Sequence, residues 1–204
     1  QSVKVYNDKG YAAKRGVGIF ARAFMERFPL IPVEDNGRLN DLPLLENFLE
    51  RVFVFHRWRS YCNSGGSLGG LVRFHTRHKL IIMAHSPKHL RQLGAIVAEA
   101  KGKDMDEVRD TYVASLMEGL KLKATVTKNT NVLQHIAGYF KRRLTADEKA
   151  EVQELIAQYH DGLLPLIVPI TLLSHFVRKY GVTYLSEQLY LSPHPKELML
   201  RNHW

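Results

Sequence analysis

Cysteine is the scarcest residue type in this sequence, and long apolar runs are missing. Cys62 is the single cysteine among 204 residues. One thiol cannot form a disulfide within the chain, and it supplies too few ligands for a thiolate metal site or an iron–sulfur cluster. The most apolar stretch, residues 163–173, is about half of the roughly 20 residues that a membrane-crossing helix needs. These absences predict a cytoplasmic protein without a membrane partner.

Carboxylates are absent from long parts of the chain. The 48 residues between Glu50 and Glu99 contain no Asp or Glu, yet they hold eight Lys or Arg and five of the ten histidines. Residues 119–146 and 162–186 are also free of acids. With a formal net charge of +9 and a pI near 9.7, the chain favours an anionic partner, which could be a nucleic acid, a membrane surface or an acidic protein.

Hydrophobic periodicity predicts a mainly α-helical protein. Residues 3–6 alternate like a strand and lead into a turn signal at 7–10, a helix is expected near 19–28, and an apolar run at 30–33 follows. Residues 1–41 therefore predict a short β-α-β fragment, the end of an α/β domain, with its linker. Residues 42–204 predict a bundle of seven or eight helices, expected over 43–61, 68–83, from 87, from 104, 128–143, from 145, 166–180 and 195–202.

Capping signals and apolar stripes refine these helices. Ser86 before Pro87, and capping-box spacing at Asp104 and Thr145, mark three helix starts. The carboxylates are expected on solvent-facing helices. The helix at 43–61 is expected to bury one apolar face, made of Leu44, Leu45, Phe48, Leu49, Val52 and Phe55.

Two neighbouring segments could bind phosphate. In the helix 68–83, His75 and Lys79 end an apolar stripe, which fits either a cleft mouth that binds a phosphate or base edge, or a core histidine beside a snorkelling lysine. His85 and Lys88 flank the expected start of the next helix, where free backbone N–H groups favour anions. The alternative there is an ordinary capped helix with incidental histidines.

A third segment has the composition of a base-stacking surface. Asn131, His135, Tyr139 and Arg142 recur on one face of the helix 128–143, which suits contacts to RNA bases but is also typical of a solvated polar face. The complete set of RNA-binding candidates is Arg73, His75, Arg77, Lys79, His85, Lys88, Asn131, His135, Tyr139, Lys141, Arg142 and Arg178.

The sequence predicts no catalytic residue and no metal site. His75 and His78, like His85 and His89, have ligand-compatible spacing, but the acid-free run offers them no carboxylate. Nucleophile-elbow, phosphate-loop and dinucleotide motifs are missing from the sequence. Cys62 has basic neighbours but no identifiable partner, so we interpret it as a structural thiol.

Five motifs occur in an order that resembles the YbgA-like family, a family of unknown function. They span about residues 50–204 and consist of His75-x-x-His78-Lys79, Met83 to Pro87, Asn131 to His135 with Gly138 to Lys141, Leu164 to Pro169, and Pro193 to Leu198 with Leu200 to Asn202. The first 50 residues, with Val3 to Asn7, Lys14 to Ala21 and Gly37 to Asp41, look like the end of the catalytic domain of two-domain proteins of the thiouracil desulfidase type.

The resemblance implies a role in RNA chemistry. The upstream domain of such proteins is similar to enzymes that remove sulfur from thiouracil or from thiolated tRNA uridines with a cysteine-bound [4Fe-4S] cluster. Its cluster cysteines would precede residue 1, so this chain has no cofactor of its own. The helical domain is then expected to present thiolated tRNA to that domain in cis.

The leading hypothesis is therefore a non-catalytic RNA-binding accessory domain, with tRNA as the expected partner. Two alternatives remain from the sequence. The first is an enzyme in which His75, His78 or His85 acts as a general base or a metal ligand, since histidine titrates near neutral pH. The second is a scaffold that docks an acidic protein.

Overall fold

The N-terminal part differs from the β-α-β prediction. The structure, a computed structural model, describes residues 3–6, 12–16, 18–195, 198 and 200–202. Strands β1 (Val3–Tyr6) and β2 (Ala12–Gly16) pair antiparallel and precede helix α1 (Ile19–Arg27), while the predicted turn at 7–10 lies outside the described residues. The run 30–33 is not a strand, because it lies between prolines, which lack the N–H that a sheet requires.

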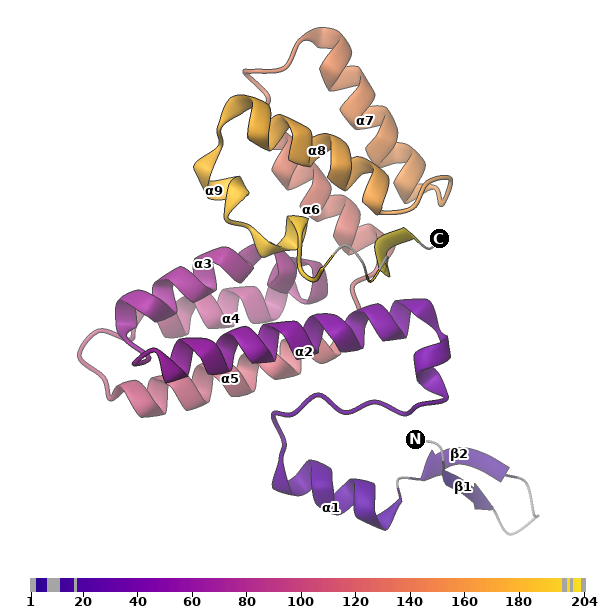
Figure 1. The fold of residues 1–204 in the computed structure, drawn as a ribbon, viewed down its shortest axis with the longest axis vertical. Coiled ribbons are helices and arrows are strands. Elements are labelled where there is room, and N and C mark those ends of the chain that lie inside the picture. Colours follow the sequence, from indigo (N-terminus) through magenta and orange to yellow (C-terminus); the bar gives the residue numbers. More distant parts are fainter. Residues whose placement is uncertain (1–2, 7–11, 17, 196–197, 199, 203–204) are drawn as a thin grey trace.

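The remainder confirms a mainly helical bundle (Figure 1). Seven long helices are followed by one short helix in the described part of this segment: α2 (Leu42–Asn63), α3 (Leu68–His85), α4 (Pro87–Ala98), α5 (Met105–Lys121), α6 (Val126–Gly138), α7 (Ala146–His160), α8 (Ile167–Tyr180) and α9 (Thr183–Ser186). None of the helices in the described ranges is both long enough and apolar enough to cross a membrane.

The bundle has two parts that meet at α3 and α6. Helices α2 to α5 pack side by side in one part, and α6, α7 and α8 form the other, with α9 beside them (Figure 1). One continuous apolar core contains four fully buried leucines, Leu71, Leu93, Leu116 and Leu133. Helix α1 lies beyond an extended segment and has no buried residue.

Helix α2 buries a different face from the one its apolar pattern predicts. The six apolar side chains of the predicted stripe are only half-buried, and the buried ones are Asn47, Glu50, Arg51, Val54 and Trp58. Two polar members of this set have internal partners, since Asn47 donates to the Leu120 carbonyl at 3.1 Å and Glu50 is ion-paired. Satisfied hydrogen bonds allow polar groups to occupy an interior position that periodicity assigns to apolar ones.

Caps and turns place the C-terminal segment. Ser86, Asp104 and Thr145 cap α4, α5 and α7 as predicted, and Thr145 completes a capping box. Helix α8 ends at Gly181, which takes a left-handed conformation, and the chain then returns through α9 and a 3₁₀ turn at Leu189–Leu191 that packs on α3.

Two predicted helices are shorter than expected. Helix α6 ends at Gly138, and a turn follows over 139–143. Within 195–202 the described residues form a 3₁₀ turn at Leu200–Asn202, whereas Lys196, Glu197 and Met199 lie outside them.

Candidate functional site

A pocket of about 270 Å³ lies between α8 and the returning C-terminal segment. We call it the C-terminal pocket. Its polar lining comes from hydroxyls and one cation on α8 and from the segment that follows the 3₁₀ turn: Thr171, Ser174, Arg178, Ser192 and His194. The reversal at Gly181 is what brings residues 191–194 back against α8.

Arginines from three helices lie around this segment. Arg178 of α8 is exposed, and half-buried Arg57 of α2 donates through Nη2 to the Pro193 carbonyl. Burial, and then the charge of Arg77 on α3, lower the pKa of Arg57, while Glu50 opposes the shift. Nη1 of Arg57 is buried without a hydrogen-bond partner among the described residues. An anion bound here would stabilise Arg57 and Arg77, because it supplies negative charge and hydrogen-bond acceptors.

His194 adds an acceptor beside the arginines. Burial lowers its pKa, so the ring is neutral at neutral pH. Nδ1 lies 3.2 Å from the Pro195 carbonyl oxygen, an acceptor, and therefore carries the proton. Nε2 is left as an acceptor with no partner in the described part of the chain. A hydroxyl or N–H donor of a ligand would satisfy it.

An exposed aromatic pair adjoins this region. Tyr139, which is 42% exposed, stacks on Tyr184 with ring centroids 5.4 Å apart and an interplanar angle of 21°. His135 meets the edge of Tyr139 at 5.6 Å. Gln188, four residues after Tyr184, donates to the Thr76 carbonyl at 2.8 Å and so ties this segment to the surface of α3. The stacked pair and the α3 arginines therefore lie on connected elements.

The turn after α6 supplies further exposed cations. Lys141 and Arg142 lie two and three residues after Tyr139, and both are exposed. Arg143 donates to the Tyr180 carbonyl at 2.8 Å, which holds the turn against the end of α8. Burial, and then the neighbouring Tyr139, raise the pKa of Tyr184 to about 12, so Tyr184 stays uncharged at neutral pH.

Most of the predicted RNA-binding residues are at the surface. Lys79 is half-buried, and the exposed ones are Arg73, Arg77, Lys88, Asn131, His135, Tyr139, Lys141, Arg142 and Arg178. Arg178 lines the C-terminal pocket, and Arg77 is close enough to Arg57 to lower its pKa, with Arg73 one turn from Arg77. Lys88 starts α4, which packs on α3 and α5 and does not line the C-terminal pocket.

His75 and His85 are interior residues. His75 Nδ1 lies 3.0 Å from the Tyr112 hydroxyl, and burial, followed by the charge of Lys79, lowers the pKa of His75 to about 4. This bears out the core-histidine interpretation. His85 is 1% exposed and points away from the start of α4. Neither ring is placed where it could meet a large ligand.

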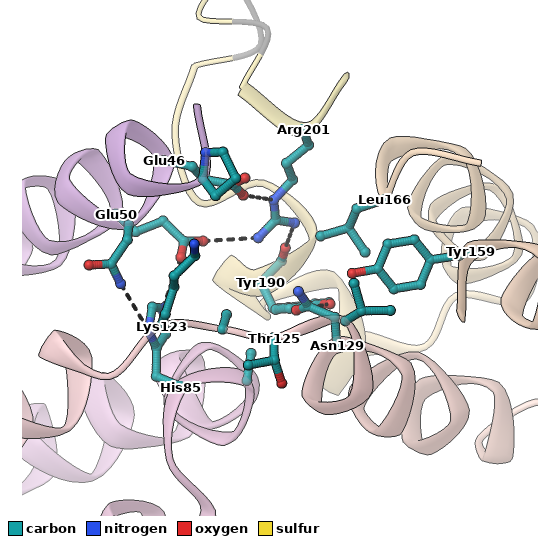
Figure 2. Close-up of a pocket in the computed structure, with 15 residues that line it drawn as sticks. Glu46, Glu50, His85, Lys123, Thr125, Asn129, Tyr159, Leu166, Tyr190 and Arg201 are labelled. Atoms are coloured by element: carbon teal, nitrogen blue, oxygen red, sulfur yellow. Dashed lines mark hydrogen bonds and ion pairs between the residues drawn. The ribbon is translucent and has the colours of Figure 1, made fainter. Parts of the chain in front are cut away.

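His85 belongs instead to a buried charge network at a second cavity (Figure 2). Its Nε2 lies 2.9 Å from Glu50, and its Nδ1 lies 2.7 Å from the Leu122 carbonyl oxygen. Nδ1 also lies 3.3 Å from Asn47 Nδ2, so protein groups occupy both ring nitrogens.

Arg201 closes the network from the C-terminal segment. It contacts Glu50 at 3.0 Å and Glu46 at 3.2 Å, and its Nη1 donates to the Tyr190 carbonyl at 2.6 Å. Figure 2 shows its guanidinium lying between the two carboxylates and Tyr190. The cavity beside it, which we call the inner cavity, has a volume of about 340 Å³.

The two carboxyl groups of the inner cavity ionise differently. Burial, then the charge of Glu50, raise the pKa of Glu46 to about 7 against the opposing effect of Arg201. Burial also raises the pKa of Glu50, but hydrogen bonding to His85 and the charge of Arg201 outweigh it and lower that pKa to about 2. Such divergent pairs are common at binding and catalytic sites.

Glu46, Glu50 and Arg57 were not among the sequence candidates. The prediction that the carboxylates face solvent is wrong for two of them: Glu46 is half-buried against Arg201, and Glu50 is buried against His85 and Arg201. One signal was available, since Asn47, Glu50 and Arg51 form a polar stripe at helical spacing inside an otherwise apolar segment.

Metal and thiol chemistry have little support here. The described ranges contain no group of three or more His, Cys, Asp or Glu placed to hold a metal ion. A cysteine-held iron–sulfur cluster does not fit a chain with one cysteine. Cys62 is half-buried, and burial raises the pKa of its thiol despite the nearby charge of Arg109.

Comparisons with known proteins identify the family. A family model described as "Protein of unknown function (DUF1722)" matches residues 79–195. The chain is also similar to "Uncharacterized protein YbgA" of Escherichia coli (strain K12), with 30% identity over 158 residues that cover 77% of this chain and 94% of that protein. No solved structure matches. The resemblance to a YbgA-like domain is therefore confirmed, and the chain belongs to the DUF1722 family.

Proposed function

We propose that this chain is a non-catalytic RNA-binding domain, with tRNA as its partner. The observation that carries the proposal is the position of two arginines at the C-terminal segment, Arg57 and Arg178, with Arg77 of a third helix close enough to Arg57 to lower its pKa. Cations from separate elements that gather on one region favour a polyanion over a small acidic group. The finer proposal is that the domain presents tRNA to a desulfidase domain upstream in the same protein.

The aromatic pair favours RNA among polyanions. Exposed Tyr139 and half-buried Tyr184 form a stacked ring surface, and unpaired bases stack on such rings. Lys141 and Arg142, shortly after Tyr139, would contact the phosphates on either side of a stacked base. An acidic protein would use the arginines but would gain little from the tyrosine pair.

The buried histidines disfavour the enzyme alternative. Burial lowers the pKa of His75 to about 4 and that of His78 to about 3, so both are neutral and inaccessible at neutral pH. Both nitrogens of His85 are engaged by protein oxygens. A nuclease that uses these residues as a general base would need them at the surface of a cleft.

Binding to tRNA of variants in the arginine cluster tests the proposal. Arg77→Ala and Arg178→Ala should each weaken binding by roughly five- to tenfold, since each removes a charge-assisted phosphate contact. Lys101→Ala is the matched control, because Lys101 is exposed in the loop between α4 and α5. Fluorescence anisotropy with labelled tRNA measures the affinities.

Two results would contradict the proposal. Equal losses for all three variants would indicate general charge attraction without a site. Ribonuclease-insensitive capture of an acidic protein, with no saturable tRNA binding, would favour the scaffold alternative.

A further inference from the structure

We infer that the inner cavity binds a single nucleotide, with its base inside the cavity and its phosphate at Lys123 on the rim. The site is separate from the surface proposed for RNA, because Asn129 and Val126 line the cavity from the face of α6 opposite Asn131 and His135. The inference goes beyond the proposed function and rests on the cavity's own charge and shape.

The inner wall of the inner cavity has balanced charge, whereas its rim is basic. Glu46 and Glu50 line the inner wall, where Arg201 is shared between them and His85 also faces Glu50. Because these carboxylates already have a cationic partner, the wall favours an uncharged group whose N–H donors the carboxylate oxygens accept. The inner end therefore favours a neutral donor-bearing part of a ligand.

Lys123 provides a positive charge at the rim. It is exposed, lines the cavity, and takes part in no ion pair within the described ranges. Its neighbour Lys128 is already engaged, because its Nζ donates to the His85 and Lys123 carbonyls at 2.7 and 3.1 Å. These bonds hold the loop that carries Lys123. An anionic group at the outer end of a ligand would pair with this lysine.

The remaining walls suit a flat ring. Tyr159 and Leu166 point toward the cavity from the side opposite Glu50 (Figure 2), and Pro43 and Val126 add further apolar surface. The volume of about 340 Å³ lies at the lower end of small-molecule sites, which are roughly 300–1,000 Å³. A single nucleobase with its ribose is a ligand of this scale, and it has a neutral ring at one end and a phosphate at the other.

Polar groups among the apolar walls match the edge of a base. The Tyr190 hydroxyl donates to Asn129 Oδ1 at 3.0 Å, which fixes the amide, and Tyr159 lines the same cavity. Burial raises the pKa of Tyr159, so its hydroxyl keeps a proton that it can donate to a ligand carbonyl. Carbonyl and N–H groups side by side are what a nucleobase edge presents to Tyr159 and to Glu46.

Calorimetric titration of the full chain with uridine and adenosine 5′-monophosphates tests the inference. Saturable binding of at least one is expected, with inorganic phosphate alone binding at least tenfold more weakly. Lys123→Ala should weaken nucleotide binding about tenfold. The matched control Lys121→Ala should leave it unchanged, because Lys121 is exposed, pairs with Glu118 and does not line the cavity.

The nucleotide could be free or could belong to bound RNA, and a competition arm separates these sources. If RNA supplies it, saturating tRNA should displace the mononucleotide, and Lys123→Ala should also weaken tRNA binding. If the ligand is a free nucleotide, its affinity should be the same with and without tRNA. Either pattern supports the nucleotide site, and only the first depends on the proposed RNA-binding function.

Failure of the inference is distinguishable from failure of the RNA proposal. Salt-sensitive tRNA binding with no nucleotide binding and no effect of Lys123→Ala would overturn the inner-cavity site alone. Nucleotide binding without tRNA binding would overturn the RNA proposal alone. Saturable binding of free amino acids, with their ammonium at Glu46, in place of nucleotides would also overturn the assignment.

Discussion

Glu46 and Glu50 lie one helical turn apart on α2 and share Arg201, yet only Glu50 is also hydrogen-bonded to His85. The extra partner stabilises the Glu50 carboxylate, while Glu46 is left with the repulsion of that carboxylate and with desolvation. Two identical side chains thus differ in charge state near neutral pH because their neighbours differ. A substitution at each residue can therefore test its charge state separately.

Glu50→Gln should destabilise the fold by about 3–5 kcal/mol, because the substitution leaves Arg201 and His85 buried without their carboxylate. Urea unfolding at neutral pH measures the change. Glu118→Gln is the control, since Glu118 is exposed and pairs only with Lys121 at the surface. A change below about 1 kcal/mol for Glu50→Gln would mean that the network is not formed.

Glu46 should make stability fall as pH rises. Its pKa is raised from 4.5 to about 7 in the folded state, so its contribution is fully present below about pH 4.5 and is lost as the pH rises through 7. Between pH 5 and 8 the wild type should lose on the order of 1–3 kcal/mol more stability than Glu46→Gln. Parallel unfolding curves for the two proteins across this range would contradict the assignment.

For the helices, the sequence predicted where a helix starts better than which of its faces is buried. The capping residues Ser86, Asp104 and Thr145 locate helix starts because a cap is a local hydrogen bond, and all three occur in the structure. The buried face of α2 was assigned wrongly, because burial of Glu50 depends on Arg201, which is 151 residues away in the chain. Periodicity can show the polar stripe of Asn47, Glu50 and Arg51, but it does not identify a partner so far away in the chain.

The residues of the candidate site also differ in whether the sequence alone could identify them. Exposed cations such as Arg77 and Arg178 could be proposed from the acid-free runs. Arg57, in contrast, joins the site through its hydrogen bond to the Pro193 carbonyl. His75 had two interpretations in the sequence, and the Tyr112 hydroxyl on α5 decides between them. Residues whose role depends on a partner in another element could not be predicted from spacing alone.

The close contact of α4 and α5 offers a test at this scale. A Cβ at Gly119 would lie 2.8 Å from the Cβ of His89, so Gly119→Ala should destabilise the fold by about 1–3 kcal/mol despite its better helix propensity. Gly138→Ala in α6 has no atom within 4 Å of the added Cβ and should stabilise by up to about 1 kcal/mol. Thermal unfolding of both variants gives the comparison, and equal effects would contradict this packing.

Across the whole molecule, cations and acids occupy different regions of the chain, and the proposed function requires the fold to gather some of the cations. Arg57 and Arg178, which are far apart in sequence, both reach the C-terminal segment, and Arg77 is close enough to Arg57 to lower its pKa. A net charge of +9 alone does not distinguish RNA from other anionic partners. In the proposed function, the tyrosine pair supplies the additional preference for bases.

The salt dependence of tRNA binding tests this account most directly. With about four phosphates engaged, log K should fall against log salt with a slope of roughly −3, at about 0.7 to 0.9 per contact. Arg77→Ala combined with Arg178→Ala should make the slope shallower by about two contacts. A slope near zero, or tRNA binding that stays weak and unsaturated at low salt, would contradict the claim that these helices form an RNA-binding surface.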